Sequence, residues 1–189
     1  MSTATSQKRW ASVAAIPHGG SLLIIALLCG VGLLIKPTFL SPMNIWAVLT
    51  IASLLAIASA GQTLVIISGN QGIDLSVGSI MTLSALIVSG MAGSSNELLP
   101  MALATVLVLG TVIGLLNGIG MRFLGLYPLV VTLGVAFVVE GLALVYAQSR
   151  APQMPGTFIE NIGIGRFLGI PWLVVICAIV AVLMTVLLR

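Results

Sequence analysis

Charged residues are what this sequence has least of. Only 6% of its 189 residues are Asp, Glu, Lys or Arg, whereas 59% are hydrophobic and the mean hydropathy is +1.25. A soluble domain usually has about a quarter of its residues charged. Because this chain cannot cover a globule with charge, the composition excludes a soluble globular protein and predicts an integral membrane protein.

Histidine and cysteine are also scarce. His18 is the only histidine, and Cys29 and Cys177 lie inside apolar segments, where cysteine usually acts as a small hydrophobe. The sequence has no CxxC, no GxxxxGK[ST] nucleotide-binding loop and no base placed to activate a serine. Its basic residues are scattered rather than clustered. We therefore expect no metal and no cofactor on this chain, no enzyme and no nucleic-acid partner.

Six apolar segments follow a polar start. Residues 1–18 carry Lys8 and Arg9 and are predicted to be a cytoplasmic tail, since basic residues favour that side. The spans are expected at about 20–35, 43–67, 76–92, 101–121, 127–147 and 171–188. Pro42 and Asn44 are expected to begin and cap the second, and the long polar connection at 148–169 to carry surface structure. The sequence predicts an all-α, polytopic membrane protein with about six transmembrane helices and both termini in the cytoplasm.

A polar, glycine-rich break at 68–79 (SGNQGIDLSVGS) separates the second and third spans. In a membrane, irregular backbone is tolerated only where protein or water covers it. Asp74 and Ser76 could each cap the following helix by accepting from its first N–H groups. Two interpretations of Asp74 stay open. It is a cap favoured by the helix dipole, or a carboxylate on a substrate pathway.

The fourth and fifth spans carry further polar and small residues. Thr132 and Glu140 fall at helical spacing and are expected on one face. Glu140 either pairs inside the bundle or lines a pore. A small-xxx-small ridge predicts close approach of another backbone, with an asparagine beside it that could bond across helices. The substrate-pathway candidates are Asp74, Ser76, Asn70, Thr132 and Glu140, and the helix-packing candidates are Gly110, Gly114, Gly118 and Asn117.

Four stretches occur in the order typical of one known family. They are FLSPMNI at 39–45, GIDLSVGS at 72–79, GLLNG at 114–118, and PLVVTLG at 128–134 with EGLA at 140–143; GIP at 169–171 also fits. The chain thus resembles the inner-membrane permease subunits of bacterial ABC importers of the ribose/xylose type. The stretch at 72–79 is the most specific. Branched-chain amino-acid permeases of the same superfamily differ there, so the sugar branch is favoured.

The resemblance implies an ATP-driven importer of a monosaccharide across the bacterial inner membrane. It implies a subunit of roughly ten helices paired with a second permease subunit, as a homo- or heterodimer. Cytoplasmic ATPase subunits would bind the ATP, and a periplasmic sugar-binding protein would deliver the substrate. Since residues 19–189 hold only about six spans, this transmembrane permease domain is expected to be incomplete at its C-terminus.

Three alternatives to a sugar permease remain. The first is a branched-chain amino-acid or nucleoside permease of the same superfamily. The second is a secondary transporter coupled to protons through Asp74 or Glu140. The third is a membrane interaction subunit that transports nothing. Capture of an ATPase subunit with the chain would separate an ATP-driven sugar permease from a proton-coupled secondary transporter.

Overall fold

A computed structural model describes the chain at residues 19–68, 72–94, 96–150, 153–154 and 156–189. The chain divides into two units, one ending at Leu49 and one beginning at Thr50. Asn70, one of the candidate site residues, lies outside the described residues.

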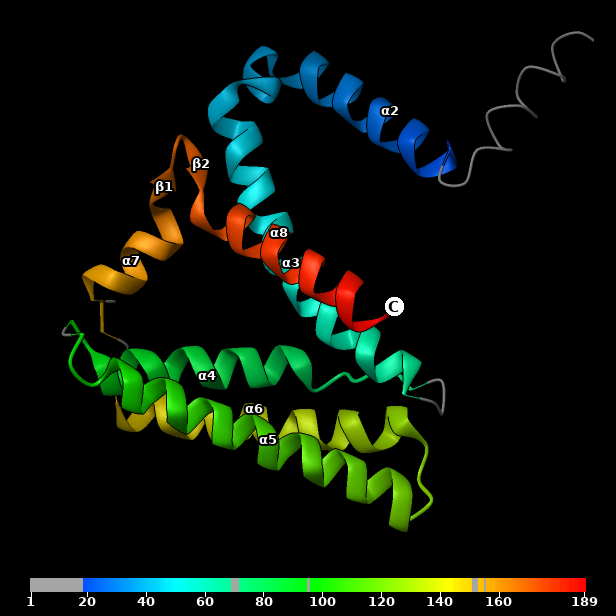
Figure 1. Cartoon of the computed structure of the whole chain (residues 1–189), viewed down its shortest axis with the longest axis vertical. Coiled ribbons are helices and arrows are strands. Elements are labelled where there is room, and N and C mark those ends of the chain that lie inside the picture. The colour runs from blue at the N-terminus through cyan, green and yellow to red at the C-terminus, as the bar shows by residue number, and fades with distance from the viewer. Residues whose placement is uncertain (1–18, 69–71, 95, 151–152, 155) are drawn as a thin grey trace, which may run out of the picture. The chain divides into compact units, whose positions relative to one another are not determined.

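Helices account for most of the described chain (Figure 1). In order they are α2 (Gly19–Ile35), the 3-10 helix η1 (Pro37–Leu40), α3 (Pro42–Ile67), α4 (Val77–Ala92), α5 (Leu99–Phe123), α6 (Pro128–Ser149), α7 (Thr157–Ile164) and α8 (Trp172–Leu187). Two short strands, β1 (Arg166–Phe167) and β2 (Ile170–Pro171), form a hairpin before α8. The prediction of an α-helical membrane protein with a break between its second and third spans is confirmed.

The apolar helices fall into two length classes. By length and composition α3, α5 and α6 can each cross a membrane. Three further apolar helices are shorter, at Gly20–Ile35, Val77–Ala92 and Trp172–Leu187. Six spans therefore stay a prediction.

The first unit holds α2, η1 and the start of α3. A Cβ added at Gly32 would lie 2.6 Å from Cδ1 of Phe39, so glycine lets the η1 ring lie against α2. The prediction that Asn44 caps α3 is wrong. Its backbone N–H donates to Ser41 Oγ at 3.4 Å, and its side-chain amide donates to the Phe39 carbonyl at 2.6 Å. Ser41 is therefore the cap, and Pro42 takes the first helical position as expected.

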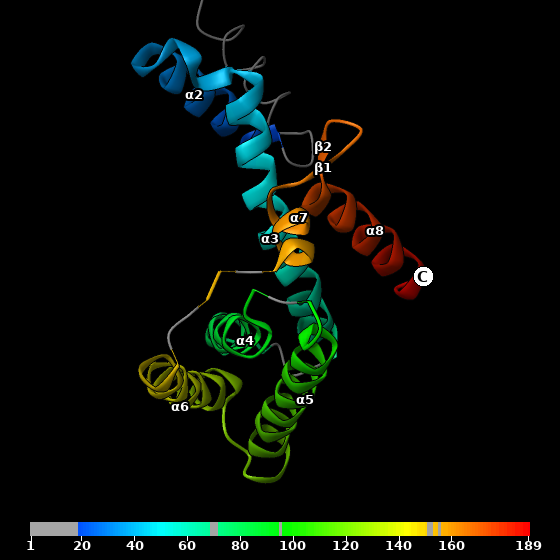
Figure 2. The ribbon, with the colours of Figure 1, turned by 90° about the vertical axis from the view of Figure 1, so that its left-hand side faces the viewer.

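The second unit contains a three-helix bundle in which α4, α5 and α6 pack against one another. Figure 2 shows α4 and α6 nearly end on, with α5 inclined beside them. The buried core of the bundle consists of Leu83 and Ile87 on α4, Ile113 on α5, and Val139 and Ala143 on α6. Where lipid is the solvent, such contacts stabilise through close packing and interhelical hydrogen bonds rather than through release of water.

Large apolar side chains cover the outside of these helices. Leu107 on α5 is 71% exposed, and Phe137 and Val145 on α6 are each 65% exposed. Water would penalise so much exposed apolar surface, whereas acyl chains accept it. The outward faces thus agree with the composition in placing these helices in lipid.

The connection after α6 is fastened to the end of α4. Ser89 Oγ donates to the Gln153 carbonyl at 2.8 Å and accepts from the Gln153 N–H at 2.9 Å. Asn96 Nδ2 donates to Thr157 Oγ1 at 2.9 Å, and Ile159 of α7 packs on the cluster of Ala92, Leu99 and Ala102. The prediction that residues 148–169 carry surface structure is confirmed by α7 and the hairpin.

Candidate functional site

The chain just before α4 is shaped by the Asp74 carboxylate. Its Oδ1 accepts from the Ser76 backbone N–H at 2.8 Å and from the Ser76 hydroxyl at 2.5 Å. Ser76 makes no side-chain cap hydrogen bond to α4, so the prediction that it caps the helix is wrong. Its hydroxyl is directed at Asp74 instead, to which it donates. Asp74 itself holds the N–H of the residue that precedes α4, which is the local bond of an Asx turn.

Asn117 of α5 extends this local bond across the bundle. Its side-chain Nδ2 donates to Ser76 Oγ at 2.9 Å and lies 3.5 Å from both carboxylate oxygens of Asp74. Asn117 is 3% exposed and Ser76 is fully buried. An amide of α5 and a carboxylate of the break are thus joined through one buried hydroxyl.

One acceptor of this network is left open. Among the described residues, the buried Oδ1 of Asn117 has no hydrogen-bond partner. Ser76 Oγ and the Asp74 carboxylate both accept hydrogen bonds, so the NH₂ group of Asn117 must face them. The amide oxygen of Asn117 therefore faces the opposite way. A water or a ligand hydroxyl would satisfy it.

Helix α6 holds the other side of the break. Thr132 Oγ1 donates to the Ile73 carbonyl at 3.3 Å, and Thr132 is 1% exposed. A Cβ added at Gly72 would lie 2.8 Å from Cβ of Pro128, the first residue of α6, so only glycine fits there without a shift. We call the set formed by Gly72, Asp74, Ser76, Asn117, Pro128 and Thr132 the break clamp.

Glu140 is not part of the break clamp. It is exposed on α6, whereas Thr132 on the same helix is buried. The expectation that the two share a face fails because eight residues at about 3.6 per turn leave the second side chain about 80° round the helix. Within the described part of the chain no hydrogen bond reaches the Glu140 carboxylate.

The glycine ridge of α5 lies on open surface. A Cβ added at Gly110, Gly114 or Gly118 meets nothing within 4 Å in the described chain. The close approach on α5 is instead made by Gly120, where an added Cβ would lie 2.8 Å from Cγ1 of Val131. Gly120 follows Asn117 by one turn and is buried with it. That shared face was the available signal for Gly120, and the ridge's role in packing against another subunit stays a prediction.

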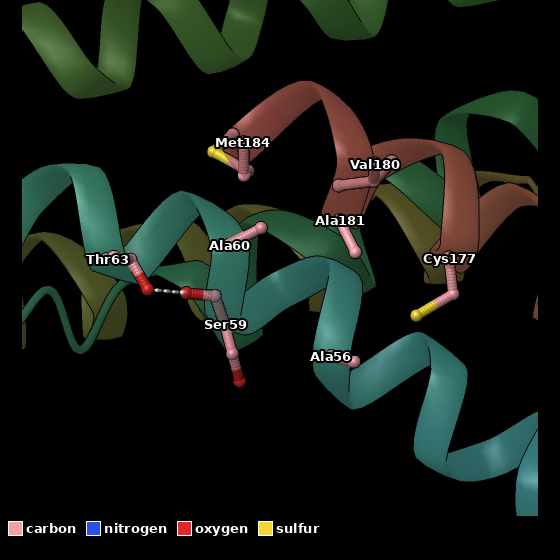
Figure 3. A pocket seen from close by; sticks show the side chains of 8 residues that line it. All are labelled: Ala56, Ser59, Ala60, Thr63, Cys177, Val180, Ala181 and Met184. Atoms are coloured by element: carbon pink, nitrogen blue, oxygen red, sulfur yellow. Dashed lines mark hydrogen bonds between the residues drawn. The ribbon is translucent and has the colours of Figure 1, made fainter. Parts of the chain in front are cut away.

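A cavity of about 410 Å³ lies between α3 and α8. Figure 3 shows its lining residues, which are Ala56, Ser59, Ala60, Thr63, Cys177, Val180, Ala181 and Met184. The Ser59 hydroxyl donates to the Leu55 carbonyl at 2.7 Å and that of Thr63 to the Ser59 carbonyl at 2.8 Å. With both donors used within α3, the cavity offers a polyhydroxylated ligand little to bind. The described residues also include no cluster of three or more metal-ligating side chains.

Comparison with known proteins gives matches along most of the chain. A family model described as "Branched-chain amino acid transport system / permease component" matches residues 44–189. The ribose import permease protein RbsC of Escherichia coli strain K12 is 33% identical over 187 residues, which cover 95% of this chain and 57% of that protein. RbsC of Bacillus subtilis strain 168 is 33% identical over 177 residues, or 88% of this chain and 52% of that protein.

A galactose relative matches a shorter stretch. The galactose/methyl galactoside import permease protein MglC of Escherichia coli strain K12 is 30% identical over 142 residues, covering 69% of this chain and 42% of that protein. The chain thus spans about half the length of the curated relatives it matches. No solved structure matches it.

Proposed function

The chain belongs to the family of permease components described for branched-chain amino acid transport systems, and from this premise we propose that it is a transmembrane permease subunit of an ATP-driven monosaccharide importer. The observation that carries the proposal is the match to a ribose import permease over 95% of the chain. The exposed apolar faces and the spanning helices α3, α5 and α6 make it a membrane protein. We place it in the bacterial inner membrane.

Sugar is favoured over amino acid as the substrate class. The description of the family names branched-chain amino acids, but the matching relatives named here are ribose and galactose permeases. A branched-chain amino acid is therefore the second candidate. The matches favour neither a proton-coupled secondary transporter nor a subunit that transports nothing.

The break clamp supports a positioning role in such a subunit. The polar groups of Asp74, Ser76 and Thr132 bond one another or the backbone, so in this conformation they are closed to a passing sugar. The clamp ties the irregular segment before α4 to both α5 and α6. We infer that these three helices move as one body during transport. Asp74, Ser76 and Thr132 would then contact a substrate only if these hydrogen bonds were broken.

The exposed position of Glu140 on α6 supports either a further subunit or a water-filled pathway beside this helix. Glu140 is the 13th of the 22 residues of α6 and exposed, near the middle of a span. A carboxylate facing acyl chains there is costly, so protein or water should cover it. A second permease subunit is the proposed cover. Separate ATPase subunits would bind the ATP, and a periplasmic binding protein would deliver the sugar.

Uptake measurements test this proposal. Cells that carry the chain with its neighbouring genes, and cells in which the chain alone is deleted, would be given labelled ribose, galactose or leucine. We expect the deletion to abolish energy-dependent uptake of at least one sugar and to leave leucine uptake unchanged. Loss of leucine uptake alone would move the proposal to the amino-acid candidate. Unchanged uptake of ribose, galactose and leucine would contradict the proposal.

A further inference from the structure

The hairpin before α8 carries apolar side chains at its tip. Arg166 pairs with Pro171 and Phe167 with Ile170, and the two residues between them have positive φ angles of 53° at Leu168 and 85° at Gly169. Two such residues form the type I′ turn, where asparagine and glycine are the usual pair. Leucine tolerates this backbone poorly, and its side chain is 89% exposed. A strained, exposed apolar residue indicates a surface that something outside the chain covers.

Aromatic side chains connect this tip to α8. The rings of Phe167 and Trp172 lie 5.0 Å apart between centroids with an interplanar angle of 35°. Trp172 is the first residue of α8. Tryptophan is enriched where a spanning helix meets the lipid headgroups, because its ring is apolar and its N–H is polar. We call Ile164, Phe167, Leu168 and Ile170 the hairpin patch; their exposures are 76%, 48%, 89% and 38%.

Helix α8 is shorter than the hydrocarbon core of a bilayer is thick, and the hairpin could make up the difference. The 16 residues of α8 extend about 24 Å at 1.5 Å per residue, whereas the hydrocarbon core of a bilayer is about 30 Å thick. A two-residue strand rises about 6–7 Å, which is close to the shortfall. In both views the hairpin tip lies beyond the N-terminal end of α8 (Figures 1 and 2).

The base of the hairpin is held to both neighbouring helices. The Trp172 N–H donates to the Gly165 carbonyl at 3.2 Å, and the Gly165 N–H donates to the Asn161 carbonyl at 2.9 Å. A Cβ added at Gly165 would collide with the Asn161 carbonyl oxygen, so the residue must be glycine. The tip therefore has a defined position relative to α8.

We propose that the hairpin patch inserts into the lipid interface at the N-terminal end of α8 and completes the hydrophobic length of that helix. Leu168 reaches the boundary between headgroups and acyl chains. Arg166, next to Phe167, is exposed and long enough to place its guanidinium among lipid phosphates. Lipid is favoured over a soluble protein partner because the patch lies at the end of α8, a helix whose exposed side chains, such as Ile179, Val182 and Val186, are themselves apolar. This inference concerns membrane placement and is independent of what the subunit transports.

Spin-label accessibility tests the proposal. In the full chain, with Cys29 and Cys177 replaced by alanine, a nitroxide would be attached at Leu168→Cys and the protein reconstituted in vesicles of phosphatidylcholine and phosphatidylglycerol. We expect the ratio of collisions with oxygen to collisions with a water-soluble nickel complex to be at least about threefold higher than at a control label on the exposed Glu160→Cys of α7. Equal ratios would overturn the proposal. So would low collision rates with both reagents, which would indicate coverage by protein.

A second readout avoids labelling the hairpin. In a chain whose other tryptophans, Trp10 and Trp46, are replaced by phenylalanine, brominated lipids should quench Trp172 fluorescence. Leu168→Asp should reduce that quenching by at least about half, whereas Leu168→Phe should retain it. Quenching that is the same in Leu168→Asp as in the parent chain would overturn the proposal, whatever the outcome of the uptake measurements.

Discussion

The amide of Asn117 donates to the Ser76 hydroxyl at 2.9 Å, and that hydroxyl donates in turn to the Asp74 carboxylate. The direction of both bonds is fixed because the carboxylate can only accept. The contact joins α5 to the break before α4 at a point closed to solvent. A buried donor–acceptor pair stabilises the fold, and removing one member leaves the other unpaired at a cost in free energy. The break clamp therefore has a structural reason to exist before any role in transport is considered.

Removing the amide should loosen the break. Asn117→Ala leaves the Ser76 hydroxyl without its donor, and we expect a loss of about 1–3 kcal/mol in the free energy of unfolding. Thr111→Val is the matched control, because Thr111 lies exposed on the same helix and its hydroxyl donates to the Leu107 carbonyl of that helix. Thermal unfolding in mild detergent measures both variants. Equal shifts in the two melting temperatures would contradict a stabilising clamp.

Charge and shape at Asp74 can be separated with two substitutions. Asp74→Asn keeps an acceptor oxygen for the Ser76 N–H and hydroxyl, so yield and much of the uptake should be retained. Asp74→Ala removes the acceptor and should lower both. Sugar uptake and yield of the assembled complex would be measured together. Abolished uptake of Asp74→Asn at normal yield would show that the charge itself is required.

Two glycines of α5 should respond differently to a methyl group. Gly120→Ala brings a Cβ to 2.8 Å from Val131 Cγ1 and should destabilise the bundle. Gly114→Ala meets open space and should stabilise the isolated chain by up to about 1 kcal/mol through helix propensity. Melting temperatures of the purified variants compare the two directly. If Gly114→Ala were the more damaging, the assignment of the packed face of α5 would be wrong.

The glycine ridge of α5 provides a test of assembly with another subunit. If Gly110, Gly114 and Gly118 pack against another subunit, Gly114→Leu should reduce capture of that subunit more than Val112→Leu does, because the larger side chain holds the helices apart. The melting temperature of the chain alone should change little in either variant. Equal capture by both would leave the ridge without a packing role.

The helices were predictable because apolar runs, and the prolines, glycines and polar residues that bound them, are local features of the sequence. The segment expected at 43–67 is α3 (Pro42–Ile67), and the one expected at 76–92 is α4 (Val77–Ala92). Proline at the first helical position sets the start of α3 and of α6. The polar break between α3 and α4 was visible for the same reason, since its glycines and its carboxylate interrupt an apolar pattern.

The partners of the polar residues were not predictable. Ser76 has the residue type and position of a cap, but its backbone is already helical, and its Oγ accepts from Asn117 and donates to Asp74 instead of accepting from an N–H of α4. Glycines at every fourth position of α5 suggest a packed face, but they do not say which helix packs there; within this chain the buried face is marked by Ile113, Asn117 and Gly120. Which face is buried depends on helices distant in sequence, and periodicity alone does not identify them.

The orientation of the chain is a further prediction. With the native cysteines replaced, a cysteine at Gln153 should react with a membrane-impermeant maleimide added to intact cells, and a cysteine at Ser6 should react only after the membrane is opened. Gln153 is exposed and bonds Ser89 through its backbone, so the substitution preserves the contact. The reverse labelling pattern would contradict the placement of both termini in the cytoplasm.

Isolation of the chain with its native partners tests whether it belongs to an ATP-driven importer. The chain would be tagged at its genomic locus, extracted in a mild detergent, and its stoichiometric partners identified by mass spectrometry. We expect an ATP-binding subunit together with a second copy of this chain or another permease subunit. Recovery of a chain that carries labelled sugar across the membrane with no ATP-binding partner would contradict this expectation.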